Sequence, residues 1–248
     1  MGFLKSCVRT VAEWYPASDR AQDAIQAFAL SSAFKAWTRR FRAADLPSFP
    51  QREQLWDYVI DTYVKEDPVC YLEFGVFDGY SIRHFARRVK HPESRFAGFD
   101  TFTGLPEDWG TLATGTFDLQ RQTPSINDSR VSFHIGLFQD SLPPFLRTFR
   151  AGKSHLVIHC DADLYSSTLF VLTQLAPYMD GAVVLFDEFN ALPHEFRALQ
   201  DFSRAYRMSY RLIGDVHPRL QRAAFEFYAG EKQPCTAPNL AGFVNGSS

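Results

Sequence analysis

The chain has 248 residues, of which 46% are hydrophobic, and its formal net charge is −2 at neutral pH. This length is typical of one α/β domain with added segments rather than of two full domains. The small net charge gives no general electrostatic reason to bind nucleic acid or an anionic membrane, so we expect neither partner. A small-molecule substrate is the expected ligand.

Cysteine usage and hydropathy indicate a soluble protein of the cytoplasm. The four cysteines lie far apart, with no CxxC pair, which argues against a zinc ribbon or a disulfide scaffold. No apolar run is long enough to span a membrane, and the first ten residues lack the apolar core of a signal peptide.

Helical spacing dominates the first quarter of the chain. Aromatic and aliphatic residues recur every three or four positions between about 10 and 41, among them Trp14, Phe28 and Trp37. Pro47 and Pro50 interrupt this pattern, and a further helix is predicted over about 51–64. We therefore predict a helical cap over 1–66 that belongs to the same domain as the main part, 67–248. This aromatic face could also support a homo-oligomer.

Strands and helices then alternate. The strand-like runs are VCYLEFGV, FAGFD, VSFHIGL, LVIHCDAD and AVVLFDE, with helices predicted over about 82–89, 166–178 and 194–207. The final runs, YRLIGD and AAFEFYA, predict an antiparallel hairpin at the edge of the sheet. The fold class is therefore α/β, with a mostly parallel sheet.

A long turn-rich segment, about 103–129, separates the second and third of these strands. Loops of this length in compact domains are usually functional or disordered, and we interpret this one as a lid over a binding site. Phe102, at its start, is a candidate to stack on a ligand.

The first strand runs into a glycine-containing turn, Glu73-Phe-Gly75-Val-Phe-Asp-Gly79-Tyr-Ser81. Glycine there lets the backbone approach a ligand closely. Phe77 and Asp78 depart from the GxGxxG pattern that admits a pyrophosphate, so a cofactor without phosphates is favoured. A tight turn without a ligand role explains the glycines equally well.

Two polar positions after the next strands point to a nucleoside. Asp100 closes the second strand, where a carboxylate commonly accepts hydrogen bonds from ribose hydroxyls. Gln139 follows the third strand, within reach of an adenine that lies across the strand ends. The alternative is that Asp100 serves as a turn or helix-capping residue.

Four carboxylates follow two later strands. Asp161 and Asp163 close LVIHCDAD, and Asp187 and Glu188 close AVVLFDE. Parallel strands bring such residues to one edge of the sheet, where a hard cation such as Mg²⁺ would relieve their mutual repulsion. The alternative is that two of them cap the following helices while the other two face solvent.

The blocks YLEFGVFDGYS, FAGFDTFTGLPEDW, GLFQDSLPPFL, HCDADLYSST and FDEF together resemble the macrocin O-methyltransferase family, over about residues 70–190. This resemblance implies a Rossmann-like class I methyltransferase fold. It also implies S-adenosylmethionine as cofactor, Mg²⁺, and transfer of a methyl group to a hydroxyl of a sugar or glycosylated natural product.

By position, the resemblance implies that Glu73, Gly75 and Ser81 surround the methionine part of the cofactor, while Asp100 meets its ribose and Gln139 its adenine. It assigns the magnesium ligands to Asp161, Asp187 and Glu188, and the removal of the substrate proton to Asp163. The family more usually has Asp-Asp-Tyr where this chain has Asp187-Glu188-Phe189.

Two other classes of protein remain open from the residues. An Asp-x-Asp strand end with a divalent metal is also found in nucleotide-sugar glycosyltransferases, although those need neither the second acidic pair nor the glycine turn. A non-catalytic protein with the same fold is the other alternative, and the cost of burying unused charge argues against it.

Overall fold

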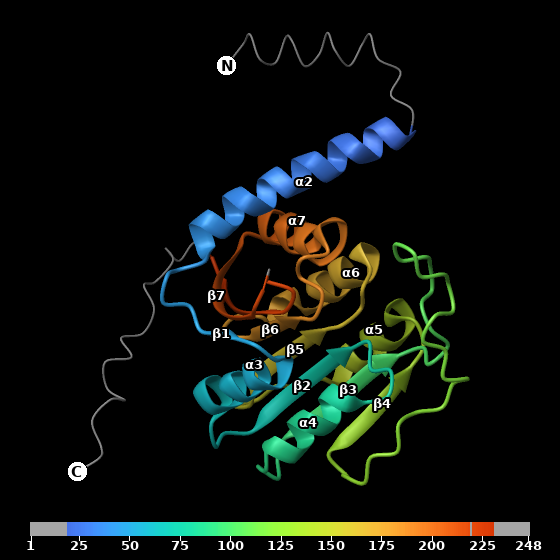
Figure 1. The fold of residues 1–248 in the computed structure, drawn as a ribbon. Coiled ribbons are helices and arrows are strands. Elements are labelled where there is room, and N and C mark those ends of the chain that lie inside the picture. Colours follow the sequence, from blue (N-terminus) through green and yellow to red (C-terminus); the bar gives the residue numbers. More distant parts are fainter. Residues whose placement is uncertain (1–18, 219, 231–248) are drawn as a thin grey trace, which may run out of the picture. The chain divides into compact units, whose positions relative to one another are not determined.

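The computed structural model describes residues 19–218 and 220–230 (Figure 1). The chain divides into two compact units, residues 1–42 and residues 43–248. The described part of the first unit is helix α2 (Asp19–Phe41). In it the Trp37 ring stacks on the rings of Phe34 and Phe41, with distances of 6.0 and 5.3 Å between ring centroids. Helical spacing thus predicts this element correctly, whereas Trp14 lies outside the described residues.

The second unit is built on one eight-stranded sheet in the order β1-β7-β8-β6-β5-β2-β3-β4. The strands are β1 (Ser48–Phe49), β2 (Val69–Phe74), β3 (Arg95–Asp100), β4 (Val131–Ile135), β5 (His155–Cys160), β6 (Val183–Phe186), β7 (Met208–Val216) and β8 (Ala223–Ala229). Five strands that are neighbours in the sheet, in the order β6-β5-β2-β3-β4, are all parallel to one another. The predicted mostly parallel α/β sheet is therefore confirmed.

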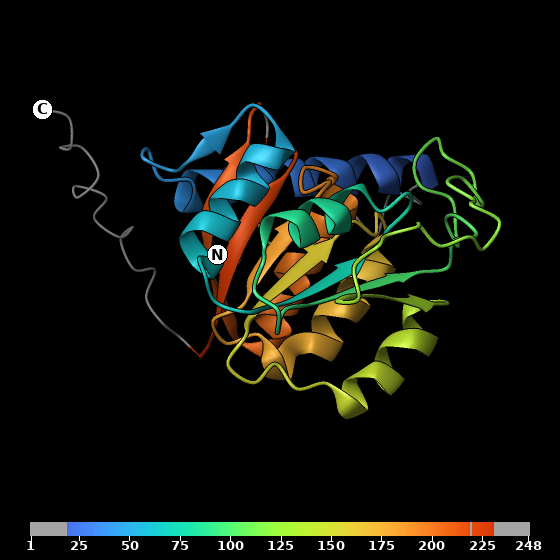
Figure 2. The same cartoon turned by 90° about the horizontal axis from the view of Figure 1, so that it is seen from below.

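Helices cover both faces of this sheet. They are α3 (Arg52–Val59), the π-helical turn η1 (Ile60–Val64), α4 (Tyr80–Arg88), α5 (Phe138–Thr148), α6 (Tyr165–Leu175), η2 (Ala176–Tyr178), η3 (Leu192–Phe196) and α7 (Arg197–Tyr206). In Figure 2 α3 and α4 lie on one side, and α5 and α6 on the other. Helix α5 is absent from the sequence-based prediction, in which Pro143 and Pro144 mask it.

The C-terminal hairpin is antiparallel, as predicted, but it does not form the edge of the sheet. Strand β8 is inserted between β6 and β7, antiparallel to both. Beyond β7 lies β1, which pairs through Ser48 and Phe49 with Asp215 and Val216. A two-residue strand carries too little periodicity to be recognised in a sequence.

The segment 43–66 belongs to the unit that holds the sheet. Leu55, Trp56 and Val59 of α3 are buried in the same core as Tyr71 of β2. The boundary at residue 66 stays a sequence-based prediction.

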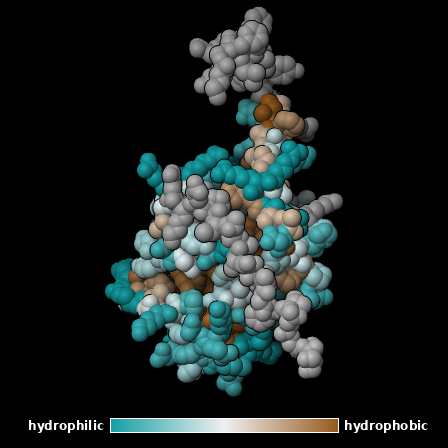
Figure 3. Space-filling model, turned by 90° about the vertical axis from the view of Figure 1, so that its left-hand side faces the viewer, coloured by the Kyte–Doolittle hydropathy of each residue, from teal (hydrophilic) through white to brown (hydrophobic). Residues whose placement is uncertain are grey.

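The surface view in Figure 3 shows mainly hydrophilic residues, with apolar ones in smaller areas between them. None of the helices in the described ranges is long and apolar enough to cross a membrane.

Candidate active site

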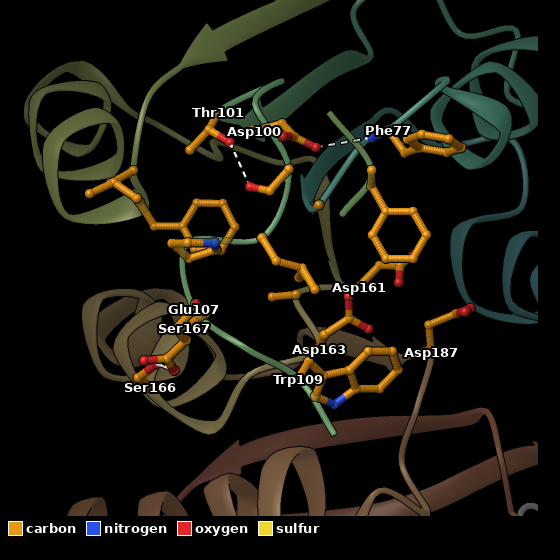
Figure 4. Close-up of a pocket in the computed structure, with 18 of the residues that line it drawn as sticks. Phe77, Asp100, Thr101, Glu107, Trp109, Asp161, Asp163, Ser166, Ser167 and Asp187 are labelled. Atoms are coloured by element: carbon orange, nitrogen blue, oxygen red, sulfur yellow. Dashed lines mark hydrogen bonds between the residues drawn. The ribbon is translucent and has the colours of Figure 1, made fainter. Parts of the chain in front are cut away.

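A pocket of about 630 Å³ opens at the carboxyl ends of β2, β3, β5 and β6. These strands are adjacent and parallel, with Phe74 beside Cys160 and Cys160 beside Phe186, so the residues that follow them meet at one edge. Figure 4 shows Asp100 and Thr101 in one part of the pocket and Asp161, Asp163 and Asp187 in another. The predicted site residues that line it are Gly75, Asp100, Gln139, Asp161, Asp163, Asp187 and Glu188.

Gly75 lets two strand ends come together. Its φ is +90°, and a Cβ added there would lie 1.8 Å from the carbonyl oxygen of Asp161. Any side chain would therefore push the turn after β2 away from the end of β5. The sequence predicts a close approach to a ligand at this turn, and in the structure the group that Gly75 approaches is the Asp161 carbonyl.

The Asp100 carboxylate orders the turn beside it. Oδ2 accepts hydrogen bonds from the backbone N–H groups of Val76 and Phe77 at 2.7 and 3.0 Å, and Oδ1 accepts one from Phe102 at 2.7 Å. A carboxylate offers about four acceptor positions, so one remains for a ligand hydroxyl. Asp100 therefore combines the turn role and the capacity for the ribose role that the sequence left as alternatives.

The wall near Asp100 is largely apolar. Phe77, Leu137 and Phe138 line it, and Gln139 adds an exposed amide at the start of α5. Flat apolar walls with one amide and one carboxylate suit an uncharged heteroaromatic base on a ribose.

Three predicted cofactor residues lie outside this lining. Glu73 is fully buried and accepts a short hydrogen bond from the Ser81 hydroxyl beneath α4. Burial raises the pKa of Glu73 to about 8 against the effect of that hydrogen bond. Because alternate residues of a strand share a face, Glu73 points the same way as Tyr71, which stacks on Phe85 of α4. Glu73 and Ser81 thus support the turn from below.

Phe102 does not stack on the pocket. Its side chain is 1% exposed and lies edge-on against Phe133 at 5.9 Å, within the core. The backbone turns inward there, with φ of 53°, while Asp100 accepts the Phe102 N–H. The prediction that Phe102 contacts a ligand is not supported by its position.

Asp161 and Asp187 continue the backbone hydrogen bonding between neighbouring strands of the sheet. The Asp161 N–H donates to the Phe74 carbonyl at 2.9 Å, and the Asp187 N–H donates to the Cys160 carbonyl at 3.1 Å. Burial, together with the charges of Asp187 and Asp163, raises the pKa of Asp161 well above its usual range. Asp161 and Asp187 thus lie close enough to repel each other, as the strand-end argument predicts.

Asp163 points into the pocket two residues further on, at a φ of 58°. Burial and the charges of Glu188 and Asp187 raise its pKa to about 7. A carboxylate with that pKa can accept a proton near neutral pH, and αL backbone at a non-glycine residue often marks a functional position.

Asp187 is paired with an arginine that the sequence argument missed. Arg222 donates from Nε to Oδ1 at 2.8 Å and from Nη2 to Oδ2 at 2.9 Å. His159 Nε2 lies 3.8 Å from Oδ1 and Arg52 Nη1 lies 3.9 Å from Oδ2. Burial would raise the pKa of Asp187, but the hydrogen bonds and charges of His159 and Arg222 lower it instead.

The register of the sheet brings Arg222 to this position. Phe186 of β6 pairs with Ala223 of β8, so the next residues outward, Asp187 and Arg222, face each other. The only sequence signal was a basic residue directly before a predicted strand. That signal predicts a contact with Asp187 only when β8 is known to pair with β6.

The predicted magnesium ligands do not form a metal site in this arrangement. Both oxygens of Asp187 are engaged by Arg222, and the Glu188 carboxylate lies 3.4 Å from the amide nitrogen of Gln221. Among residues 19–218 and 220–230, no three His, Cys, Asp or Glu side chains are grouped to hold a metal ion. The donor set therefore does not fit Mg²⁺, because its central carboxylate already binds a guanidinium.

The lid predicted between β3 and β4 lies against the pocket. Leu105, Glu107, Trp109 and Phe117 from this loop line it. The Ser166 hydroxyl of α6 donates to Glu107 Oε1 at 3.0 Å, so the loop is tied to the far wall. The segment thus supplies apolar side chains to the pocket lining, and Phe117 lies against Phe77, with 5.5 Å between their ring centroids.

A family model described as a methyltransferase domain matches residues 72–189. The matched segment runs from β2 to the acidic residues after β6 and leaves out both Arg52 and Arg222. This segment, just under half of the chain, is therefore similar to methyltransferase domains. No curated protein sequence matches the chain.

Several solved structures are similar to this chain. The O-methyltransferase NovP is 22% identical, with 72% of this chain and 78% of that chain covered and a TM-score of 0.50, which shows a shared Rossmann-like fold. CalS11, a TDP-rhamnose 3'-O-methyltransferase of calicheamicin biosynthesis, is 20% identical (87% and 98% covered, TM-score 0.49). TomG, an O-methyltransferase from Streptomyces achromogenes in complex with SAM, is 19% identical (82% and 90% covered, TM-score 0.46).

Proposed function

We propose that this protein transfers a methyl group from S-adenosylmethionine to a hydroxyl of a small molecule. One observation carries the proposal. A single pocket is lined by Gly75 in the turn after β2, by Asp100 at the end of β3, and by the Asp163 carboxylate after β5. The similarity of residues 72–189 to a methyltransferase domain supports the same class and favours it over a nucleotide-sugar glycosyltransferase or a non-catalytic protein.

The proposed cofactor end is the Asp100 part of the pocket. The remaining acceptor position of Asp100 would take a ribose hydroxyl, and Gln139 would meet the adenine between the apolar residues Leu137 and Phe138. When bound, S-adenosylmethionine supplies an electrophilic methyl carbon on a sulfonium.

Asp163 is the proposed general base. It lies in the acidic part of the pocket, and its pKa of about 7 suits removal of a proton from an acceptor hydroxyl. With S-adenosylmethionine bound, its methyl carbon would pass to the acceptor oxygen and the electron pair of the carbon–sulfur bond would stay on sulfur, while Asp163 keeps the proton. Holding oxygen and carbon in line can itself lower the barrier by several kcal/mol.

The proposed acceptor is a sugar-bearing natural product. The resemblance to the macrocin O-methyltransferase family, which we retain as a proposal, suggests a sugar hydroxyl, and CalS11 is a methyltransferase of TDP-rhamnose. Leu105 and Trp109 add apolar surface to the pocket lining that a bare sugar would leave unfilled. An acceptor with both a sugar and an apolar part would contact this apolar surface as well as the acidic residues.

The proposal uses no divalent metal, because the Asp187 carboxylate is held by Arg222. A cytoplasmic location and assembly into a homo-oligomer remain predictions from the sequence.

Calorimetric titration with S-adenosylhomocysteine tests the cofactor end. We expect one saturable site per chain, and Asp100→Ala should weaken it. Asp128→Ala is a matched control, since that carboxylate also accepts a backbone N–H in a turn but lies outside the pocket lining. Absence of binding by a folded wild-type sample would overturn the proposal.

A further inference from the structure

Arg222 places a positive charge beside the acidic residues that follow β5 and β6, through its contact with Asp187. Four carboxylates follow β5 and β6, and at least one firmly held positive charge must balance them. The Arg222 guanidinium donates two parallel hydrogen bonds to the Asp187 carboxylate, at 2.8 and 2.9 Å. This fork-to-fork geometry is the strongest form of arginine–carboxylate pairing.

The backbone fixes the pair from both sides. The Phe189 N–H donates to the Gln221 carbonyl at 2.7 Å, and the Val216 N–H donates to the Arg222 carbonyl at 2.9 Å. Arg222 is therefore anchored between β6 and β7 and does not belong to a loose loop. The side chains of Asp187 and Arg222 are 6% and 19% exposed.

Neighbouring groups strengthen the same arrangement. Arg222 Nη2 lies 4.0 Å from Glu188 Oε1, so its charge reaches the second acidic residue too. Arg52, which lines the pocket, lies 3.9 Å from Asp187 Oδ2. A divalent ion on Asp187 would be repelled by two guanidinium groups and would have to share both carboxylate oxygens with Arg222.

We propose that Arg222 takes the place of a divalent cation in this site, so that methyl transfer proceeds without a bound metal ion. This inference rests on the proposed methyltransferase function. Arg222 acts as a positioning residue: it neutralises Asp187 and holds it in place, while Asp163 alone takes the proton from the acceptor hydroxyl. The reaction balances without a metal, since the proton passes to Asp163 and the electron pair of the broken bond stays on sulfur.

Binding of Mn²⁺, followed by electron paramagnetic resonance, tests the inference directly. The wild-type protein should bind no stoichiometric Mn²⁺, with or without S-adenosylhomocysteine. Arg222→Gln should bind one Mn²⁺ per chain, because it frees both oxygens of Asp187. Arg211→Gln is the matched control: it removes another partly buried arginine–carboxylate pair, with Glu226, from the same sheet and should gain no site.

Turnover gives the second measurement. Wild-type activity should change less than twofold between EDTA and millimolar Mg²⁺. Arg222→Gln should lose at least tenfold in EDTA and recover part of that loss on addition of Mg²⁺, which a merely structural role would not produce. Arg222→Lys, which keeps the charge, should remain metal-independent.

One Mn²⁺ bound per wild-type chain would overturn the inference, and so would a folded Arg222→Gln protein that gains no site. If Arg222→Gln does not fold, the wild-type titration still decides the question. The cofactor titration is separate: failure to bind S-adenosylhomocysteine would overturn the methyltransferase proposal, whereas the Mn²⁺ result without ligand would still support or refute the cation role.

Discussion

Replacing Gly75 with alanine should destabilise the protein strongly, and the structure supplies the size of the effect. A Cβ there would lie 1.8 Å from the Asp161 carbonyl oxygen, so the backbone after β5 would have to move by more than 1 Å to reach even a tight 3.0 Å contact. Overpacking of this kind typically costs about 1–3 kcal/mol. The φ of +90° adds about 1–2 kcal/mol for a non-glycine residue.

Gly181→Ala provides the matched control. Gly181 has a φ of +79°, and no heavy atom lies within 4 Å of the position of its added Cβ. Its replacement should cost only the backbone term, about 1–2 kcal/mol. The difference between the two variants therefore isolates the close approach of β2 to β5.

Urea denaturation monitored by circular dichroism would measure both changes. We expect Gly75→Ala to lose about 2–5 kcal/mol of unfolding free energy. The protein that remains folded should no longer bind S-adenosylhomocysteine, because the end of β5 at Asp161 shifts. Equal losses for the two variants would show that the contact with Asp161 contributes nothing, and the account of this turn would be wrong.

Other predictions concern the chemistry and the lid. Asp163→Asn should lower turnover by about 10²–10⁴-fold with cofactor affinity unchanged, and steady-state kinetics with calorimetry would check both; near-normal turnover would exclude Asp163 as the base. Since the base must be ionised and its pKa in the folded protein is raised to about 7, kcat/KM should fall tenfold per pH unit below that value, and a flat profile from pH 5 to 8 would contradict this. The same shift makes Asp163 lower the stability of the wild type as pH rises from about 4 to 7, because only the unfolded state releases the proton there. Asp163→Asn should therefore gain stability relative to wild type at pH 8 but not at pH 4, as urea titrations at both values would show. Ser166→Ala, which removes the tie to Glu107, should raise KM for the acceptor about two- to fivefold without changing cofactor affinity, whereas an unchanged KM would argue that the tie does not hold the lid.

Much of the fold follows from local patterns. The runs at 69–74 and 183–186 are buried throughout, and buried parallel strands appear in a sequence as continuous apolar stretches. Helix α5 is missed because Pro143 and Pro144 lie in its middle, where proline usually ends a helix. Strand β1 is missed because two residues show no period.

The site is predicted in part for the same reason. Polar residues that follow parallel strands must meet at one edge, so the proximity of Asp100, Asp161 and Asp187 follows from the order of elements alone. The directions of Glu73 and Phe102 do not follow from it. Strand alternation turns Glu73 beneath α4, and the left-handed backbone at Phe102 turns that ring into the core.

The sequence by itself therefore determined the α/β class, the edge of the sheet that carries the pocket, and the acidic character of one end. These depend on periodicity and on elements adjacent along the chain. Only the tertiary structure decided what balances that acidity. Arg222 lies 35 residues from Asp187, and the two face each other because β8 inserts antiparallel beside β6. Cross-strand register depends on packing of the whole sheet, which no local pattern encodes.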